Sequence, residues 1–412
     1  MAATMDQQRR AMTPQQRTTL YMVMGVTLAL DAGNGVVFGL IAEIQDAHGI
    51  TTPQLGLISA SLFGASLLGV LGLAHLADKG HARTMLLSGL ALGAVSTAWF
   101  GLATHLWEFV ASRALSGIAV SLFISAGRSL VTRIDPTRAG ENLGRLAGAE
   151  ITGFIIGPVV GAGLYAVGGL SLPFFVLSGI AAAAFVFFVV KFPHHDGPED
   201  EVPRPATRQS YRQLTGLDLL GNRKVLAAAL LALAVFLPVG AYDSMWSKYL
   251  HDLGASATFV GTSLTLYGVP LVLLSGRGGR LVDRLGPMTA GKRAMTCAIP
   301  VIVAYGVLDS YWIVALTAIV EAVIQAVASP SAQAAMAKAC PPDRIGAGQG
   351  LAGAFGLSGG GLLASVAPAV YDRYGAGVLF TSVGVLVGAI AIAAFALDAS
   401  ANARLTPATQ PA

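Results

Sequence analysis

Apolar and polar residues alternate along this chain in long blocks. Twelve apolar blocks, each close to the roughly 20 residues that a helix needs to cross a hydrocarbon layer, are separated by short polar segments. Blocks of this length are typical of transmembrane helices, so we predict twelve spans. They lie at about 20–42, 54–76, 84–104, 108–131, 144–167, 171–191, 224–247, 257–276, 288–308, 311–336, 347–369 and 376–397.

The longest polar gap, 192–223, is rich in charge and proline and separates the spans into two sets of six. The predicted fold class is an all-α membrane protein built from two six-helix bundles. Within the gap, the segment 210–222 is read either as a short interfacial helix or as a polar lead-in to the seventh span. The predicted units are an N-tail at 1–19, a first bundle at 20–191, a linker at 192–223, a second bundle at 224–397 and a C-tail at 398–412.

An internal repeat relates the two sets of spans. A shift of 205 residues brings Trp107 onto Trp312 and the motif Leu-Ala-Gly-Ala at 146–149 onto 351–354. Because six is an even number of crossings, the two copies have the same orientation in the membrane. We therefore expect pseudo-symmetric halves with a central cavity between them near the midplane.

Composition supports a membrane protein: 54% of residues are hydrophobic, 12% are charged and the mean hydropathy is +0.66. Of the 26 Lys and Arg residues, all but Lys248, Arg373 and Arg113 lie in the N-tail, the even-numbered loops or the C-tail, or at the span ends that adjoin them. The positive-inside rule then places both termini in the cytoplasm. Basic loops beside anionic lipid explain the net charge of +4 without a nucleic-acid partner. We expect a monomer in a bacterial plasma (inner) membrane.

The fifth span carries regularly spaced glycines. Gly153, Gly157 and Gly161 share one helix face, where a neighbouring backbone can approach closely, and Pro158 is expected to bend the helix. The pattern Gly144, Gly153, Gly157-Pro158 and Gly161 resembles the antiporter motif of the major facilitator drug/proton antiporters with twelve helices. The resemblance implies alternating access of two bundles, driven by protons.

Two predicted loops resemble the cytoplasmic loop signature of the same family. The loop at 278–288 matches it well, and the loop at 74–84 matches it loosely. The resemblance implies a network of charges that latches the cytoplasmic side shut in one conformation, whereas a solvated positive-inside loop is the alternative. The residues involved are Asp78, Lys79, Arg83, Gly279, Asp283, Arg284 and Gly286.

Charged residues inside spans are the candidate transport site, because charge in hydrocarbon is costly and usually functional. Arg113, in the sequence Arg-Ala-Leu-Ser-Gly at 113–117, resembles the family's conserved arginine. Asp31 lies near the midplane of the first span, with Asn34 on the same face. We predict an Asp31–Arg113 ion pair at the cavity, with Asp31 exchanging protons; a purely structural pair is the alternative.

Three further acids lie within or near spans. Glu321 begins a polar stripe with Gln325, read either as cavity lining or as interhelical hydrogen bonding. Asp243, near the outer end of the seventh span, lines an outer vestibule or lies exposed at the interface. Glu150 binds a proton or a cationic substrate, or pairs with Arg145.

Together with these features, the resemblance implies a secondary active transporter that exports a small amphipathic drug or metabolite in exchange for protons. A facilitator or importer of a small metabolite or lipid-linked substrate is the alternative, and a receptor or sensor on the same fold is a rival from another class. We expect no enzyme activity, cofactor or metal site, since no nucleophile–base or metal-ligand constellation stands out.

Overall fold

The protein is an all-helical bundle in a computed structural model that describes residues 12–73, 81–134, 139–191, 212, 215–341 and 344–405. The described residues contain helices and turns and no strand. Within these residues, ten helices are long and apolar enough to cross a membrane, and the last of them, Ile345–Ala403, contains both of the final two predicted spans. The predicted sites Asp78 and Lys79, most of the linker and the ends of both tails lie outside the described residues.

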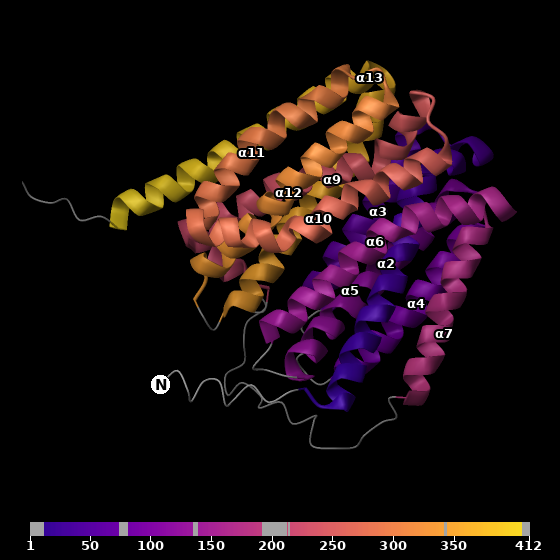
Figure 1. The fold of residues 1–412 in the computed structure, drawn as a ribbon, viewed down its shortest axis with the longest axis horizontal. Coiled ribbons are helices and arrows are strands. Elements are labelled where there is room, and N and C mark those ends of the chain that lie inside the picture. The colour runs from indigo at the N-terminus through magenta and orange to yellow at the C-terminus, as the bar shows by residue number, and fades with distance from the viewer. Residues whose placement is uncertain are drawn as a thin grey trace, which may run out of the picture.

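Six helices form the N-terminal half: α2 (Pro14–His48), α3 (Thr52–Leu73), α4 (Ala82–Leu102), α5 (Leu106–Ile134), α6 (Ala139–Gly168) and α7 (Leu172–Lys191). The C-terminal half contains α9 (Arg223–Asp252), α10 (Ala257–Leu285), α11 (Pro287–Ala304), α12 (Tyr311–Ala339) and α13 (Ile345–Leu405), together with two short 3₁₀ helices, η4 (Leu217–Gly221) and η5 (Tyr305–Val307). Figure 1 shows the first set in indigo to magenta and the second in orange to yellow, side by side.

The first helix shows how local sequence sets an element's ends. Thr13 accepts a hydrogen bond from the backbone amide of Gln16, and the Gln16 side chain bonds back to Thr13, which forms a capping box ahead of Pro14. The helix stops at Gly49, whose positive φ of 64° suits glycine. As a result α2 is longer at both ends than the predicted span at 20–42.

A second glycine, Gly375, divides the last helix in two and so brings the number of long helices in the described part of the chain to twelve. α13 is continuous by hydrogen bonding but has non-helical geometry at Gly375, with φ 78°. This residue separates the two predicted spans at 347–369 and 376–397, so α13 is two helices joined at a bend. Its end continues to Leu405, past the predicted start of the C-tail, and extends away from the bundle in Figure 1.

The repeat is visible in the helix boundaries. α10, α11 and α12 begin 205 residues after α3, α4 and α5, respectively. The offset inferred from side-chain matches is therefore also the offset of the structural elements. The twelve helices, counted with α13 divided at Gly375, confirm the predicted fold class.

Each half has its own apolar core, and the halves meet along several helix pairs. The C-terminal core is formed mainly by side chains of α9, α11, α12 and α13, and the N-terminal core by side chains from all six helices of that half. Contacts between the halves join α6 to α10, α3 to both α13 and α9, and α2 to both α9 and α10. Between α3 and α9, Phe63 packs edge-to-face on Phe236 with ring centroids 6.3 Å apart.

Both ends of the bundle can be assigned from contacts. At one end, the Gln16 side chain near the start of α2 donates to the carbonyl of Ile134 at the end of α5, 2.6 Å away. At the other, the His48 ring lies 5.1 Å from Phe109, near the start of α5. We call these the N-tail end and the far end.

Candidate functional site

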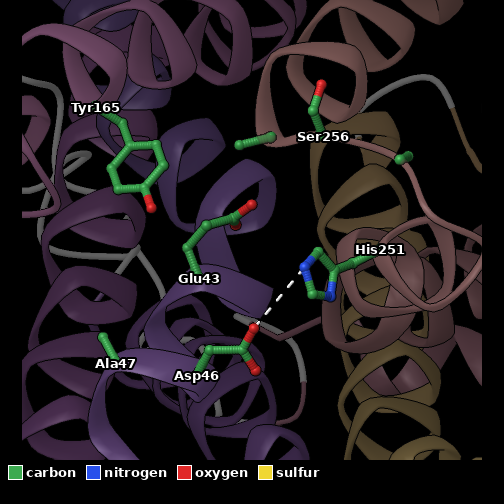
Figure 2. Close-up of a pocket in the computed structure, with 8 residues that line it drawn as sticks. Glu43, Asp46, Ala47, Tyr165, His251 and Ser256 are labelled. Atoms are coloured by element: carbon green, nitrogen blue, oxygen red, sulfur yellow. Dashed lines mark ion pairs between the residues drawn. The ribbon is translucent and has the colours of Figure 1, made fainter.

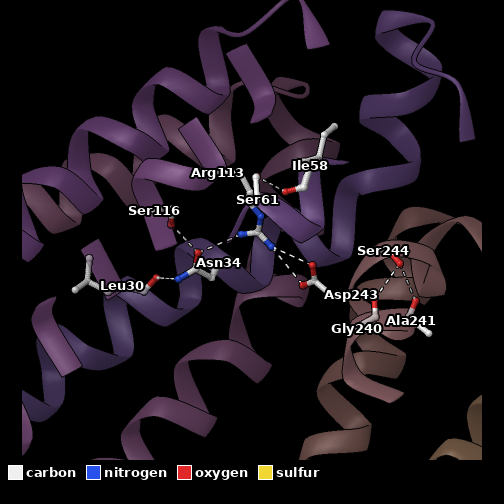
Figure 3. A network of polar contacts seen from close by, with 10 residues as sticks. All are labelled: Leu30, Asn34, Ile58, Ser61, Arg113, Ser116, Gly240, Ala241, Asp243 and Ser244. Carbon is white, nitrogen blue, oxygen red and sulfur yellow. Dashed lines mark hydrogen bonds and ion pairs between the residues drawn. The ribbon is translucent and has the colours of Figure 1, made fainter. Parts of the chain in front are cut away.

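A buried ion pair joins the two halves. Arg113 of α5 is 1% exposed, and its Nη2 donates to both carboxylate oxygens of Asp243 on α9, at 3.3 and 3.4 Å. Asp243 is also buried. Figure 3 shows the guanidinium reaching from the N-terminal half to this carboxylate. Because both charges are out of water, each depends on the other for compensation.

The opposite side of the guanidinium is held within the N-terminal half. Nη1 of Arg113 donates to Oδ1 of Asn34 at 3.1 Å, and the Ser116 hydroxyl donates to the same oxygen at 2.8 Å. The Asn34 amide nitrogen donates to the carbonyl of Leu30 at 3.4 Å. Asn34 therefore presents its oxygen to Arg113, and Ser116 supports it (Figure 3). The Nε of Arg113 is buried and has no hydrogen-bond partner.

The predicted Asp31–Arg113 pair is wrong. α2 runs to His48, so Asp31 lies 17 residues from its far end, about 25 Å at 1.5 Å per residue. Arg113 lies only seven residues from the far end of α5, or about 10 Å. Asp243, nine residues before the end of α9 at Asp252, is at a matching depth. The sequence offered two readings for Asp243, a residue that lines an outer vestibule or an acid exposed at the interface. The structure matches neither, because Asp243 is buried in the ion pair.

Asp31 lies instead near a second charged pair. Arg128 of α5 donates to Glu150 of α6 at 3.2 Å, and both are within electrostatic reach of Asp31. Glu150 thus pairs with Arg128 and not with Arg145, the partner named from sequence. Asp31 is partly exposed and makes no ion pair with any described residue.

A carboxylate ringed by tyrosines lies within the C-terminal half. Glu321 of α12 accepts hydrogen bonds from the hydroxyls of Tyr242 at 2.8 Å and Tyr305 at 2.7 Å. The Trp246 ring stands edge-on to Tyr305, with centroids 5.1 Å apart. Gln325, one turn on, donates to the carbonyl of Val235 on α9 at 3.3 Å. Both stripe residues therefore make interhelical hydrogen bonds, which is the second of the two readings.

Tyr305 was missed by sequence reasoning. It lies in η5, just past α11, in a run that reads only as the apolar end of a span. A single tyrosine in such a run gives no signal of a partner, because its role depends on α12 lying alongside. No group of three or more His, Cys, Asp or Glu side chains among the described residues is arranged to hold a metal ion.

The glycine motif of α6 lies against α2, as the spacing predicts. A Cβ added to Gly153 or Gly157 would collide with the carbonyls of Leu28 or Ala32, respectively, and one on Gly161 would lie 2.9 Å from the Val36 side chain. Gly144 precedes this packed segment in the same helix. The close backbone approach is therefore confirmed, although the antiport role of the motif remains a prediction.

The same segment of α6 also contacts the C-terminal half. A Cβ on Gly261 of α10 would lie 2.6 Å from the carbonyl oxygen of Pro158, and the Thr265 hydroxyl donates to the carbonyl of Ile155 at 2.8 Å. Pro158 occurs inside the helix and has no amide hydrogen to donate. The motif helix is thus packed between its own half and the other.

The second signature is not the loop that was predicted. Gly279, Asp283 and Arg284 lie in the last turns of α10, which ends at Leu285. Only Gly286, with φ 82°, makes the turn into α11. Asp283 and Arg284 are exposed, and neither makes an ion pair with a described residue. Arg83 lies in the first turn of α4.

Comparisons with known proteins identify relatives of this chain. A family model described as Major Facilitator Superfamily matches residues 23–247, and one described as MFS_1 like family matches residues 148–382. The chain is 22% identical over 241 residues to "Multidrug resistance protein MdtG" of Proteus mirabilis (strain HI4320), covering 58% of this chain and 59% of that protein. It is 26% identical over 216 residues to the protein of that name from Serratia proteamaculans (strain 568), covering 52% and 51%. The chain thus spans somewhat more than half the length of these curated relatives.

Solved structures share the fold over nearly the whole chain. A bacterial homolog of the human lysosomal transporter Spinster, in an inward-facing and occupied conformation, superposes with a TM-score of 0.73 at 13% identity, covering 95% of this chain and 97% of that one. The human organic anion transporter MFSD10 superposes with a TM-score of 0.68 at 20% identity, covering 93% and 100%. At these identities the likeness concerns the fold.

Proposed function

Because the chain belongs to the major facilitator superfamily, we propose that it is a secondary active transporter that exports small amphipathic compounds in exchange for protons. The observation that carries the proposal is the buried ion pair of Arg113 and Asp243, which spans the two halves. The MdtG relatives, named for multidrug resistance, add support for export of drug-like compounds. The proposal is therefore one of transport and not of catalysis.

Alternating access requires the halves to separate at one end while they close at the other. In this arrangement they are joined toward the far end, where the Ser247 hydroxyl of α9 donates to the carbonyl of Gly39 on α2 at 3.0 Å. We propose that the N-tail end faces the cytoplasm, as the distribution of basic residues favours. The far end is then the outer one, and this arrangement is closed to the outside.

The charged turn at the end of α10 fits the same cycle. Asp283 and Arg284 lie at the cytoplasmic end in this orientation and are exposed. We propose that they pair with residues of the first signature, Asp78, Lys79 and Arg83, once the cytoplasmic ends close. These ion pairs would then form in the state that is closed at the cytoplasmic end, whereas this structure is closed at the far end.

Asp31 is the proposed proton-coupling acid. It lies inside a span, is partly exposed and makes no ion pair with a described residue. An unpaired carboxylate there is costly as an anion, and uptake of a proton or of a cationic substrate removes that cost. Competition between proton and substrate for one carboxylate links export to proton entry. The proton and the substrate can each shift the balance between the two states only as far as their affinities for those states differ.

The test uses purified protein in liposomes with an imposed pH gradient and ethidium as the transported probe. We expect gradient-driven ethidium movement that collapses with a protonophore, and its loss in Asp31→Asn. The exposed carboxylate variant Asp309→Asn serves as the matched control and should transport as the parent does. Full gradient-driven transport by Asp31→Asn would remove Asp31 from the coupling role. Ethidium movement that ignores the gradient would favour a facilitator, and ethidium binding without movement would favour a receptor.

A further inference from the structure

A cavity of about 490 Å³ opens between the two halves at the far end. It is separate from the Arg113 and Glu321 sites, and none of the residues that form those sites lines it. Its walls come from α2 and α6 on one side, and from the end of α9 and the start of α10 on the other (Figure 2). The polar and aromatic lining residues are Glu43, Asp46, Tyr165, His251 and Ser256.

The charges in this cavity are unbalanced. Glu43 and Asp46 lie three residues apart on α2 and so share a helix face. His251 of α9 lies beside them: its Nε2 is 3.8 Å from Asp46 Oδ2, and the two side chains are 41% and 58% exposed. A screened pair of this kind contributes little. Glu43 Oε2 is buried and has no hydrogen-bond partner.

Neighbouring charges do not supply the missing cation. Lys248, one turn before His251, is paired with Asp252. Asp252 also accepts a hydrogen bond from the Tyr371 hydroxyl at 2.9 Å. The lysine is therefore engaged on its own helix, and the two carboxylates of α2 line the cavity with the His251 imidazole beside Asp46.

We propose that this cavity binds a compact organic cation, a primary ammonium carrying a short aromatic or aliphatic group. The ammonium lies between Glu43 and Asp46, where charge-assisted hydrogen bonds satisfy the unpartnered oxygen. The apolar group packs on the Tyr165 ring and the methyl groups of Ala47 and Ala255, which also line the cavity. The volume falls within the roughly 300–1,000 Å³ typical of small-molecule sites.

Binding at this place has a conformational consequence. The walls belong to both halves, so the site exists only while the far ends are together. A ligand that binds only one state stabilises that state by RT ln(1 + [L]/Kd), where [L] is the free ligand concentration and Kd its dissociation constant. A bound ammonium therefore holds the halves in this arrangement and slows transport from the side on which the cavity opens. The slowing rests on the proposed transport function, whereas the binding does not.

The binding test uses full-length protein in detergent, with phenethylammonium as the probe and 2-phenylethanol as its neutral match. We expect phenethylammonium to raise the melting temperature in a saturable way, and 2-phenylethanol to have no saturable effect. Glu43→Gln and Asp46→Asn should each weaken the apparent affinity about tenfold, which corresponds to the loss of about 1.4 kcal/mol. Asp372→Asn, an exposed carboxylate near the same end of the bundle, should leave the affinity unchanged.

His251→Gln separates a ligand site from a general loss of structure. Removing the imidazole removes the competitor for Asp46, so phenethylammonium should bind as tightly as in the parent or more tightly. Equal melting shifts with the ammonium and the alcohol, or shifts that survive the double variant Glu43→Gln/Asp46→Asn, would overturn the site. If binding is confirmed but ethidium transport ignores the pH gradient, the site stands and the antiport proposal fails.

Discussion

Arg113 and Asp243 lie on different halves of the protein, yet the guanidinium of the first donates to both carboxylate oxygens of the second. The side chains are 2% and 3% exposed, so water does not screen the pair. A buried pair gains little over apolar residues of the same size, but it is costly to break one-sidedly. The contact between the halves therefore depends on the charge of both partners.

We expect Asp243→Asn to destabilise this arrangement, and the cause is the loss of charge compensation and not a loss of packing. The substitution leaves the Arg113 charge buried and uncompensated, at a cost of about 3–5 kcal/mol. We expect a lower melting temperature in detergent and at least a tenfold slower ethidium transport. The double variant Arg113→Gln/Asp243→Asn removes both charges and should recover part of the stability. If the two single losses simply add in the double variant, the pair is not coupled.

Two glycines of α6 offer a matched test of the close approach to α2. A Cβ on Gly157 would collide with the carbonyl of Ala32, whereas one on Gly148 has open space around it. Gly157→Ala should therefore cost about 1–3 kcal/mol through overpacking. Gly148→Ala should be neutral or slightly stabilising, since alanine favours a helix. Thermal unfolding of both variants checks the difference, and equal melting temperatures would contradict the tight α2–α6 contact.

The sequence predicted the elements that hydrophobic length and glycine spacing control. The twelve spans and the 205-residue offset are both visible in the helix boundaries. The packing of Gly153 and Gly157 on α2 follows from their four-residue spacing. These features depend on neighbours along the chain or on one helix face, so a pattern can reveal them.

Features that depend on helix ends were not predictable in this way. Hydropathy marks the stretch that fits hydrocarbon and not the residue at which the helix stops. The predicted spans therefore end before Asp283 in α10 and before His48 in α2, although both helices continue. That error in α2 led to the wrong depth for Asp31, and hence to the wrong partner for Arg113. The true partner lies 130 residues further along the chain, in the other half, which no local spacing indicates.

The tyrosines around Glu321 should contribute to stability through their hydroxyls. Tyr305→Phe leaves the ring in place and removes the donor to Glu321 Oε2. A buried acceptor left unpaired costs about 1–3 kcal/mol. Tyr242→Phe should act in the same way at Oε1. Tyr374→Phe, at an exposed ring, is the control and should leave the melting temperature unchanged. An unchanged melting temperature in Tyr305→Phe would show that Glu321 does not need its tyrosine donor.

Docking of η4 onto the C-terminal half should depend on pH. Arg344 donates to both oxygens of Asp218, at 2.9 and 3.0 Å, and these hydrogen bonds are the main reason that the pKa of Asp218 lies below its ordinary value. A carboxyl group whose pKa is lowered on docking contributes stability above its undocked pKa of about 4 and loses it as the pH falls through the docked value. We therefore expect full docking at pH 6 and weakened docking at pH 3.

Hydrogen exchange of the η4 amides measures this docking. The amides of Leu219 and Asn222, which donate to the carbonyls of Gly216 and Leu219, respectively, should be protected at pH 6 and less protected at pH 3, after correction for intrinsic exchange rates. Asp218→Asn should show the weaker protection at both values. Arg344→Lys keeps the charge but loses the two-pronged geometry, so its protection should be intermediate. Equal protection of the parent at both pH values would mean that η4 is held by apolar contacts such as that of the buried Leu219, and not by the ion pair.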